Sequence, residues 1–201
     1  MALDRTRIVT EAVALLDAEG LDNVTLRKLA ARLGVQAPTL YWHIPNKAAL
    51  ITAIAEEILT PLPAAPSSAE ERWQDWLIGM AQGLRRALLA HPDGARIISM
   101  AQLSRNMAAL SELAMSTLVA KGVPLHQARV MVFTVERMTI GFALEEQGPR
   151  PDEEAARSFD LTPYPTMIAG ITAYFGAGRT IDDMFLECVT VVVEGPPKTE
   201  P

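Results

Sequence analysis

Three side chains with polar rings follow one another at Tyr41, Trp42 and His43, in a chain that is only 5% aromatic. They come shortly after Pro38 and Thr39. A phenol O–H, an indole N–H and an imidazole can hydrogen-bond to phosphate oxygens, and the ring edges can contact the methyl group of thymine. Tyr and Trp rings also cover small cores while their polar ends stay in water. The residue types alone therefore leave two roles open.

The segment around these rings is basic, whereas the chain as a whole is acidic. The net charge is −6, from 18 Lys and Arg against 24 Asp and Glu. Residues 24–54 contain no acid, and their four basic residues are Arg27, Lys28, Arg32 and Lys47. Because Lys and Arg supply most of the affinity for a phosphate backbone, this segment is the candidate for contact with nucleic acid in an otherwise acidic protein.

Caps and apolar spacing predict the helices that would position the rings. A first helix is expected over 5–19, with Asp4 as its N-cap. Thr25 can cap a second helix over 26–33, which Gly34 ends because the following turn favours a positive φ. Pro38 suits the first turn of a third helix over 37–43. Two short helices joined in this way are typical of a helix-turn-helix, whose second helix enters the major groove of DNA.

The helical period decides between the two roles of the rings. With Leu40 directed inward, the opposite face of the third helix carries Pro38, Thr39, Tyr41 and Trp42. An outward face in the basic, acid-free segment favours contact with DNA over the covering of a core.

The sequence of this region resembles that of a known family. The segment TLRKLAARLGVQAPTLYWHIPNKAAL, residues 25–50, is similar to the DNA-binding region of the tetracycline-repressor (TetR) family of bacterial regulators. It is most similar to the tetracycline-responsive subgroup, for which PTLYWH followed by NK is characteristic. A weaker likeness continues in residues 73–95 (WxxxL, RRALL, DGA) and in TIGFALEEQ at 139–147.

The resemblance implies a set of residues that contact operator DNA. These are Arg27, Ala37, Pro38, Thr39, Tyr41, Trp42, His43 and Lys47. Ala37 departs from the subgroup, which has a Gln suited to adenine at this position, and it offers only a methyl group to thymine. His43 has an alternative role as a cap of the helix C-terminus.

The remainder of the chain is also predicted to be helical. Asn46 can cap a fourth helix over 47–60, and the prolines of 61–68 predict a linker. Further helices are expected over 69–90, 93–101, 105–121, 125–147, 164–177 and 180–193, with a mobile surface loop at 148–163. The expected fold is all-α. It comprises a three-helix helix-turn-helix domain at 1–46, a connecting helix at 47–60 and an effector-binding and dimerisation domain at 61–201.

The resemblance also locates a candidate effector site. The tetracycline-responsive subgroup binds magnesium-tetracycline through two His, an Asn, a Phe and a Thr. An ungapped alignment places Pro63, Met80, Leu84, Ile98 and Ala101 at those positions. None of these side chains suits Mg²⁺, so we expect no metal or other cofactor and a small, largely hydrophobic effector.

The candidate effector-binding residues are Met80, Leu84, Ile98, Ala101, Met115, Val132 and Glu136. Met and Leu at helical spacing also form plain core, which is the alternative for the apolar members. Glu136 could meet a cationic ligand or pair with Arg137 or Arg85. We favour pairing, because buried acids generally find a partner in the protein.

The last predicted helix has a broad apolar stripe made of Ile181, Met184, Phe185, Cys188, Val189 and Val192. Burial within the chain is one explanation. The resemblance instead implies that this helix and 125–147 pair with their copies in a four-helix bundle, which we favour and which would make the protein a homodimer. Cys188 is then expected to be a small buried apolar residue.

Several classes of protein are disfavoured by the sequence. No apolar run is long enough to span a bilayer and the N-terminus lacks the apolar segment of a signal peptide, so we expect a cytoplasmic protein without membrane contact. One cysteine and three scattered histidines give no metal-ligand spacing. An enzyme using His91 or His126 with Cys188 or a carboxylate would lack any known catalytic motif.

The expected protein is therefore a homodimeric, ligand-responsive repressor, with double-stranded operator DNA and a small-molecule effector as partners. The alternative is a DNA-binding regulator without a small-molecule effector, controlled by a protein partner. The two differ in whether the Met-bearing region is hollow.

Overall fold

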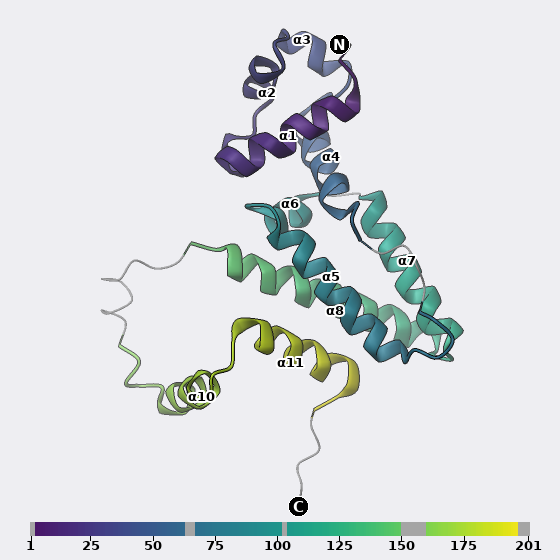
Figure 1. Cartoon of the computed structure of the whole chain (residues 1–201), viewed down its shortest axis with the longest axis vertical. Coiled ribbons are helices and arrows are strands. Elements are labelled where there is room, and N and C mark those ends of the chain that lie inside the picture. The colour runs from purple at the N-terminus through teal and green to yellow at the C-terminus, as the bar shows by residue number, and fades with distance from the viewer. Residues whose placement is uncertain (1–2, 63–66, 102–103, 150–159, 197–201) are drawn as a thin grey trace, which may run out of the picture.

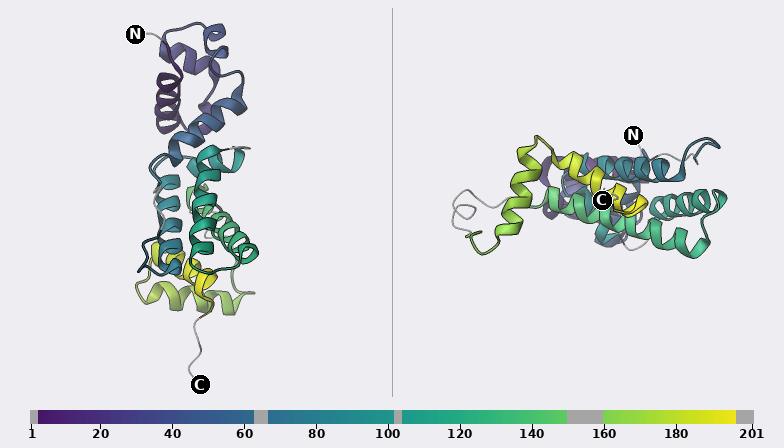
Figure 2. Two further views of the ribbon diagram at one scale, coloured as in Figure 1. Left: turned by 90° about the vertical axis from the view of Figure 1, so that its right-hand side faces the viewer. Right: turned by 90° about the horizontal axis from the view of Figure 1, so that it is seen from below.

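The computed structural model describes residues 3–62, 67–101, 104–149 and 160–196, and the regular elements within these ranges are all helices. A small N-terminal head is joined by one helix, α4, to a longer helical body (Figure 1). The view from the side shows the same elongated arrangement (Figure 2). The expectation of an all-α fold is confirmed.

The head consists of α1 (Arg5–Glu19), a 3₁₀ turn η1 (Leu21–Asn23), α2 (Leu26–Leu33) and α3 (Ala37–Tyr41). The expected caps are present, because the Asp4 side chain accepts from Arg7 N–H and Thr25 accepts from Lys28 N–H. Gly34 ends α2 in the left-handed region at φ 68°. Helices α1 and α2 have the predicted bounds, whereas α3 ends at Tyr41, two residues earlier than expected.

Helix α4 (Lys47–Leu59) connects the head to the body. Asn46 caps it by accepting a hydrogen bond from Ala49 N–H. It packs on α1 of the head and on α5, α6 and α7 of the body. Ile54 and Ile58 are fully buried. A displacement of α4 therefore changes the position of the head relative to the body.

The body is built around the packed pair α5 (Trp73–Leu89) and α8 (Leu125–Gln147), which also contact α6 (Gly94–Met100) and α7 (Arg105–Ala120). Helix α8 has the predicted bounds. Helix α5 begins four residues later than expected, because the backbone is still extended at Arg72 and no side chain caps the helix. Residues 63–66 of the expected linker and 150–159 of the expected loop lie outside the described residues.

Helix α10 (Pro165–Gly176) lies to one side of the body in Figure 1 and in the right-hand view of Figure 2. None of its residues is buried. Its large apolar side chains, including Ile171 and Phe175, face solvent in the isolated chain.

Helix α11 (Ile181–Glu194) packs on α5 and α8 through one face only. Phe185, Val189 and Val193 are buried there, and the Phe185 ring meets the Phe142 ring edge-on at 5.2 Å between centroids. Phe185 and Val189 therefore belong to the core of their own chain, contrary to the expectation that they face a second copy. Their spacing of four residues repeats at Val193, so a continuous stripe of α11 is used within the chain.

The other expected dimerisation residues lie beside that buried stripe. Ile181 and Cys188 are exposed, and Met184 and Val192 are half-buried. The expectation of a buried Cys188 is thus not met in the isolated chain.

Polar contacts fix the head to the body at one place and the connecting helix α4 to the body at another. The Asp93 carboxylate accepts a hydrogen bond from the backbone N–H of Leu21 at 2.9 Å. His91 Nδ1 lies 2.8 Å from an Asp17 carboxylate oxygen. These contacts join α1 and η1 to the turn between α5 and α6.

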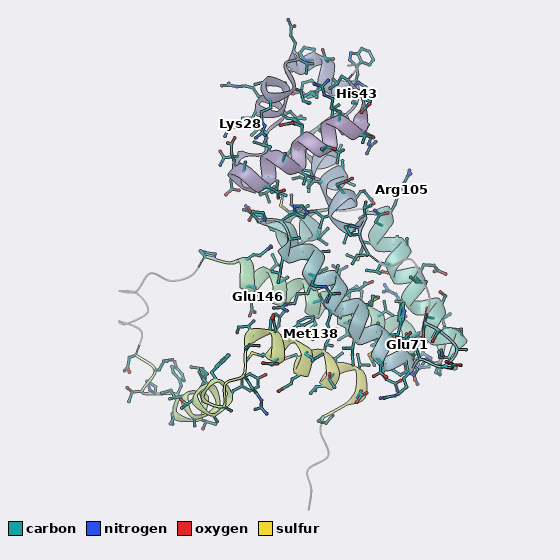
Figure 3. All side chains as sticks on the ribbon, viewed as in Figure 1. Lys28, His43, Glu71, Arg105, Met138 and Glu146 are labelled. Carbon is teal, nitrogen blue, oxygen red and sulfur yellow. The ribbon has the colours of Figure 1, made fainter. Side chains whose placement is uncertain are left out.

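The second place is the N-terminus of α7, where Figure 3 shows Arg105 beside the lower part of α4. The Glu56 carboxylate of α4 accepts from the backbone N–H groups of Arg105 and Asn106. The Asn106 amide in turn donates to the backbone oxygen of Glu56 at 2.8 Å. Helices α4 and α7 are therefore connected by three hydrogen bonds.

Candidate nucleic-acid interface and effector cavity

The outer face of α3 presents two large rings to solvent. Leu40 is fully buried, whereas Tyr41 is 50% exposed and Trp42 is 89% exposed. Pro38 and Thr39 are also exposed. A Trp side chain rarely lies so open on a monomeric surface without a partner, because its large apolar ring gains free energy on burial. This face can therefore contact a large ligand through ring edges and the indole N–H.

Backbone hydrogen bonds, and not the His43 ring, cap the C-terminus of α3. The backbone N–H groups of His43 and Ile44 both donate to Leu40 O, at 2.9 and 2.8 Å. No hydrogen bond of the His43 ring is found among the described residues, so the structure gives no support to its role as a cap. In Figure 3 His43 and Lys28 lie on opposite sides of the head.

The four basic residues around α2 and α3 fall into two kinds. Lys28 Nζ lies 2.7 Å from a Glu19 carboxylate oxygen, and Arg32 Nε lies 2.5 Å from one of Glu11. The acids come from α1, outside the acid-free segment.

Arg27 and Lys47 are exposed, and neither has an ion pair among the described residues. The positive charge that remains available for phosphate is therefore carried by these two side chains. Ala37, at the start of α3, is half-buried and has only a methyl group to offer.

A cavity of ≈ 550 Å³ lies between α6, α7 and α8. Of the expected effector residues, Ile98, Ala101, Met115 and Glu136 line it. Met80, Leu84 and Val132 do not line it and are buried in the core. For these three the plain-core alternative describes the structure better than the effector-binding expectation.

The sequence reasoning missed most of the wall that α7 contributes. Met107 and Ser111 precede Met115 on α7 at intervals of four residues, and all three line the cavity. This four-residue spacing is the signal that could have identified them from Met115 alone. Phe133, likewise missed, shares the cavity-facing side of α8 with Glu136.

Glu136 is buried, and its one hydrogen bond among the described residues comes from Ser111 Oγ at 2.6 Å. Arg85, one of the two partners expected for it, instead pairs with Glu146 and Asp182. Arg137 forms no ion pair with it either. The favoured expectation of a Glu136–arginine pair was therefore wrong.

Burial raises the pKa of the Glu136 carboxyl, and the Ser111 hydrogen bond and the charges of Arg137 and Arg129 oppose this only in part. A group with such a perturbed pKa in a cavity is a candidate functional residue.

The described residues contain no helix that is both long and apolar enough to cross a membrane.

Comparison with known protein families divides the chain into two matched regions. Residues 8–54 match the model of bacterial regulatory proteins of the tetR family. Residues 65–195 match the model of the tetracyclin repressor-like C-terminal domain. The tetracycline repressor protein class A from transposon 1721 of Escherichia coli is 35% identical to this chain over 196 residues, which cover 96% of this chain and 90% of the relative.

Solved structures give the same result. A possible TetR family transcriptional regulator from Streptomyces coelicolor A3(2) superposes with a TM-score of 0.84 at 30% identity, covering 96% of this chain and 98% of that chain. The crystal structure of BioQ with its natural double-stranded DNA operator superposes with a TM-score of 0.67 at 30% identity, covering 74% of this chain and 90% of that chain.

Proposed function

Because the chain belongs to the TetR family of transcriptional regulators, we propose that it is a ligand-responsive repressor that binds a pseudo-palindromic operator as a homodimer. A small, largely hydrophobic effector other than magnesium-tetracycline releases it from DNA. The resemblance inferred from the sequence is confirmed, and the family is a class of DNA-binding regulators and not of enzymes. The protein acts in the cytoplasm, where its DNA target is.

The observation that carries the DNA-binding part is the exposure of Tyr41 and Trp42 at the end of α3, in a head whose Arg27 and Lys47 have no ion pair among the described residues. In a helix-turn-helix the second helix lies in the major groove. Aromatic side chains there contact the edges of the DNA bases, and basic side chains contact the phosphates. The structural relative BioQ is solved with a DNA operator, which supports the same use of the head.

The homodimer part is supported by the apolar side chains that the isolated chain leaves in water. Helix α10 has no buried residue, and α11 exposes Ile181 beside the half-buried Met184. Contiguous exposed apolar surface of this kind marks an interaction site. A two-fold pair would place two α3 helices in successive major grooves of one operator.

The effector part is supported by the composition of the cavity between α6, α7 and α8, whose wall combines apolar side chains with the buried Glu136. Tetracycline repressors are among the relatives of this chain, yet Ile98 and Ala101 in the cavity wall lack an oxygen or nitrogen that could bind Mg²⁺. Met107 and Met115 line the same space with flexible, polarisable side chains suited to an apolar ligand.

Release from DNA requires that the effector binds the DNA-incompetent state more tightly than the DNA-bound state. The cavity is lined by α7, whose first residues are bonded to Glu56 of α4. A shift of α7 on binding would therefore move α4 and change the separation of the two recognition helices.

The proposal is tested by the affinity of the purified protein for the DNA that flanks its own gene, measured by fluorescence anisotropy. Trp42→Ala is expected to weaken specific binding by roughly 1–3 kcal/mol in each half-site, because it removes a base-contacting ring. Leu89→Ala is the control, since Leu89 is partly exposed on α5, far along the chain from α3. Equal affinities for the wild type and Trp42→Ala would exclude α3 as the recognition helix.

A further inference from the structure

We propose that the effector is an organic ammonium ion with an apolar, aromatic body, and that the Glu136 carboxylate binds its N–H group. This inference rests on the proposed function and names the chemical class of the ligand for the same cavity. It rests on the burial of Glu136, on its incomplete hydrogen bonding and on the chemistry of the surrounding wall.

Glu136 is 4% exposed, although a carboxylate side chain is almost never fully buried without a partner. Its two oxygens can accept about four hydrogen bonds. Ser111 supplies one of them, at 2.6 Å, and neither Arg129 nor Arg137 forms an ion pair with Glu136. Among the described residues the carboxylate therefore has one protein donor and lines the cavity, where a ligand that donates N–H groups could reach it.

The rest of the wall suits the body of such a ligand. Ile98, Met107, Met115 and Ile140 provide apolar surface, and the Phe133 ring provides an aromatic face. The volume of ≈ 550 Å³ lies in the range of small-molecule sites. An ammonium group on an aromatic or aliphatic stem would reach Glu136 while its body remains against these side chains.

Arg129 and Arg137 also line the cavity and bear on the sign of the ligand's charge. Their guanidinium carbons lie 5.0 and 4.9 Å from the centre of the Phe133 ring, and both side chains are exposed. Exposed cations are hydrated and their fields are screened. An ammonium–carboxylate contact at the buried Glu136 is charge-assisted and less screened than a contact with an exposed arginine. An anionic ligand would instead give Glu136 no donor beyond Ser111 Oγ.

Three probes with one apolar body and different head groups test the proposal on the full-length protein by calorimetry: phenylbutylamine, phenylbutanol and phenylbutanoate. We expect the amine to bind at least about tenfold more tightly than the alcohol, as one charge-assisted hydrogen bond implies. Glu136→Gln is expected to reduce the affinity for the amine to that for the alcohol and to leave the alcohol unchanged.

Glu112→Gln is the matched control, because Glu112 is an exposed acid next to Ser111 that does not line the cavity. It removes the same charge and is expected to leave all three affinities unchanged. Ala108→Trp, at an exposed position of the cavity wall, is expected to block the amine and the alcohol alike. This variant tests the location of binding even if Glu136→Gln does not fold.

Tightest binding of the butanoate, equal amine affinity in wild type and Glu136→Gln, or no binding of any probe at millimolar concentration would each overturn the proposal. Operator affinity of the same preparations keeps the two hypotheses separate. Operator binding without a preference for the amine would support the proposed function and contradict the inference about the ligand. A preference for the amine without operator binding would support the inference about the ligand and contradict the proposed function.

Discussion

Arg27 and Lys28 are neighbours in the sequence, but only one of them has its charge free for DNA. Lys28 is bonded to Glu19, which keeps the pKa of that carboxyl below its usual range, whereas Arg27 has no ion pair among the described residues. We expect Arg27→Ala to weaken operator binding and to reduce the slope of log affinity against log salt by about one per protomer. Lys28→Ala should change the slope much less. Anisotropy titrations at several KCl concentrations measure both, and identical slopes for the two variants would contradict the assignment.

The buried carboxyl of Glu136 affects stability in a direction that depends on pH. Its pKa is raised mainly by burial, so the folded state holds the proton more strongly than the unfolded chain does. The resulting stabilisation is complete below the ordinary pKa and is lost as the pH rises through the raised one. At neutral pH we therefore expect Glu136→Gln to increase the free energy of unfolding, by on the order of 1 kcal/mol.

Urea unfolding of both proteins at neutral pH and near pH 4.5, the usual pKa of the group, measures this effect. The difference between variant and wild type should shrink toward the acidic pH. A variant that is less stable than the wild type at neutral pH would show that the ionised carboxylate stabilises the fold.

A side-chain cap made the starts of α1 and α2 predictable, and apolar spacing alone placed α8, which has no side-chain cap. Asp4 and Thr25 define the starts of α1 and α2 in the sequence and in the structure. Helix α5 has no side-chain cap, and its start was misplaced. The run Val191–Val193 is helical in spite of its β-branched residues because Val193 is buried against the body.

The DNA-binding face and the effector cavity also differ in how well the sequence predicted them. The exposure of Trp42 could be predicted because it depends only on the face of one short helix. The cavity depends on how α6, α7 and α8 are placed relative to one another, which the spacing within each helix does not determine. Met80 and Leu84 were consequently assigned to a wall that they do not form.

At the scale of elements, Glu56 couples the connecting helix to the wall of the cavity. Its carboxylate accepts from the first two N–H groups of α7, where a negative charge also interacts favourably with the helix dipole. We expect Glu56→Ala to lower the free energy of unfolding by about 1–2 kcal/mol, as the loss of a helix cap does. It should also reduce the effect of a bound ligand on operator affinity.

Glu57→Ala is the matched control for this change. Glu57 is the next residue of α4, is exposed, and makes no side-chain hydrogen bond or ion pair among the described residues. Thermal unfolding and operator titrations with and without phenylbutylamine measure both properties. A Glu56→Ala protein with unchanged stability and an unchanged ligand effect would contradict this role of Glu56. The effect of the ligand would then reach α4 through its contacts with α6 or α5.

At the scale of the whole molecule, the free face of α11 decides whether two chains can read one operator. Cys188 is exposed on this face, whereas Leu186 is exposed on nearly the opposite side of the helix, since two residues correspond to a rotation of about 200°. We expect Cys188→Glu to give a monomer at micromolar concentration, because it would place two charges in an apolar two-fold interface. Operator affinity should fall as well, because each half-site is then bound by a single monomer.

Leu186→Glu is the control, because it introduces the same charge and should leave a dimer. Sedimentation velocity measures the mass of each protein, and a monomeric wild type or a dimeric Cys188→Glu would exclude this face as the interface.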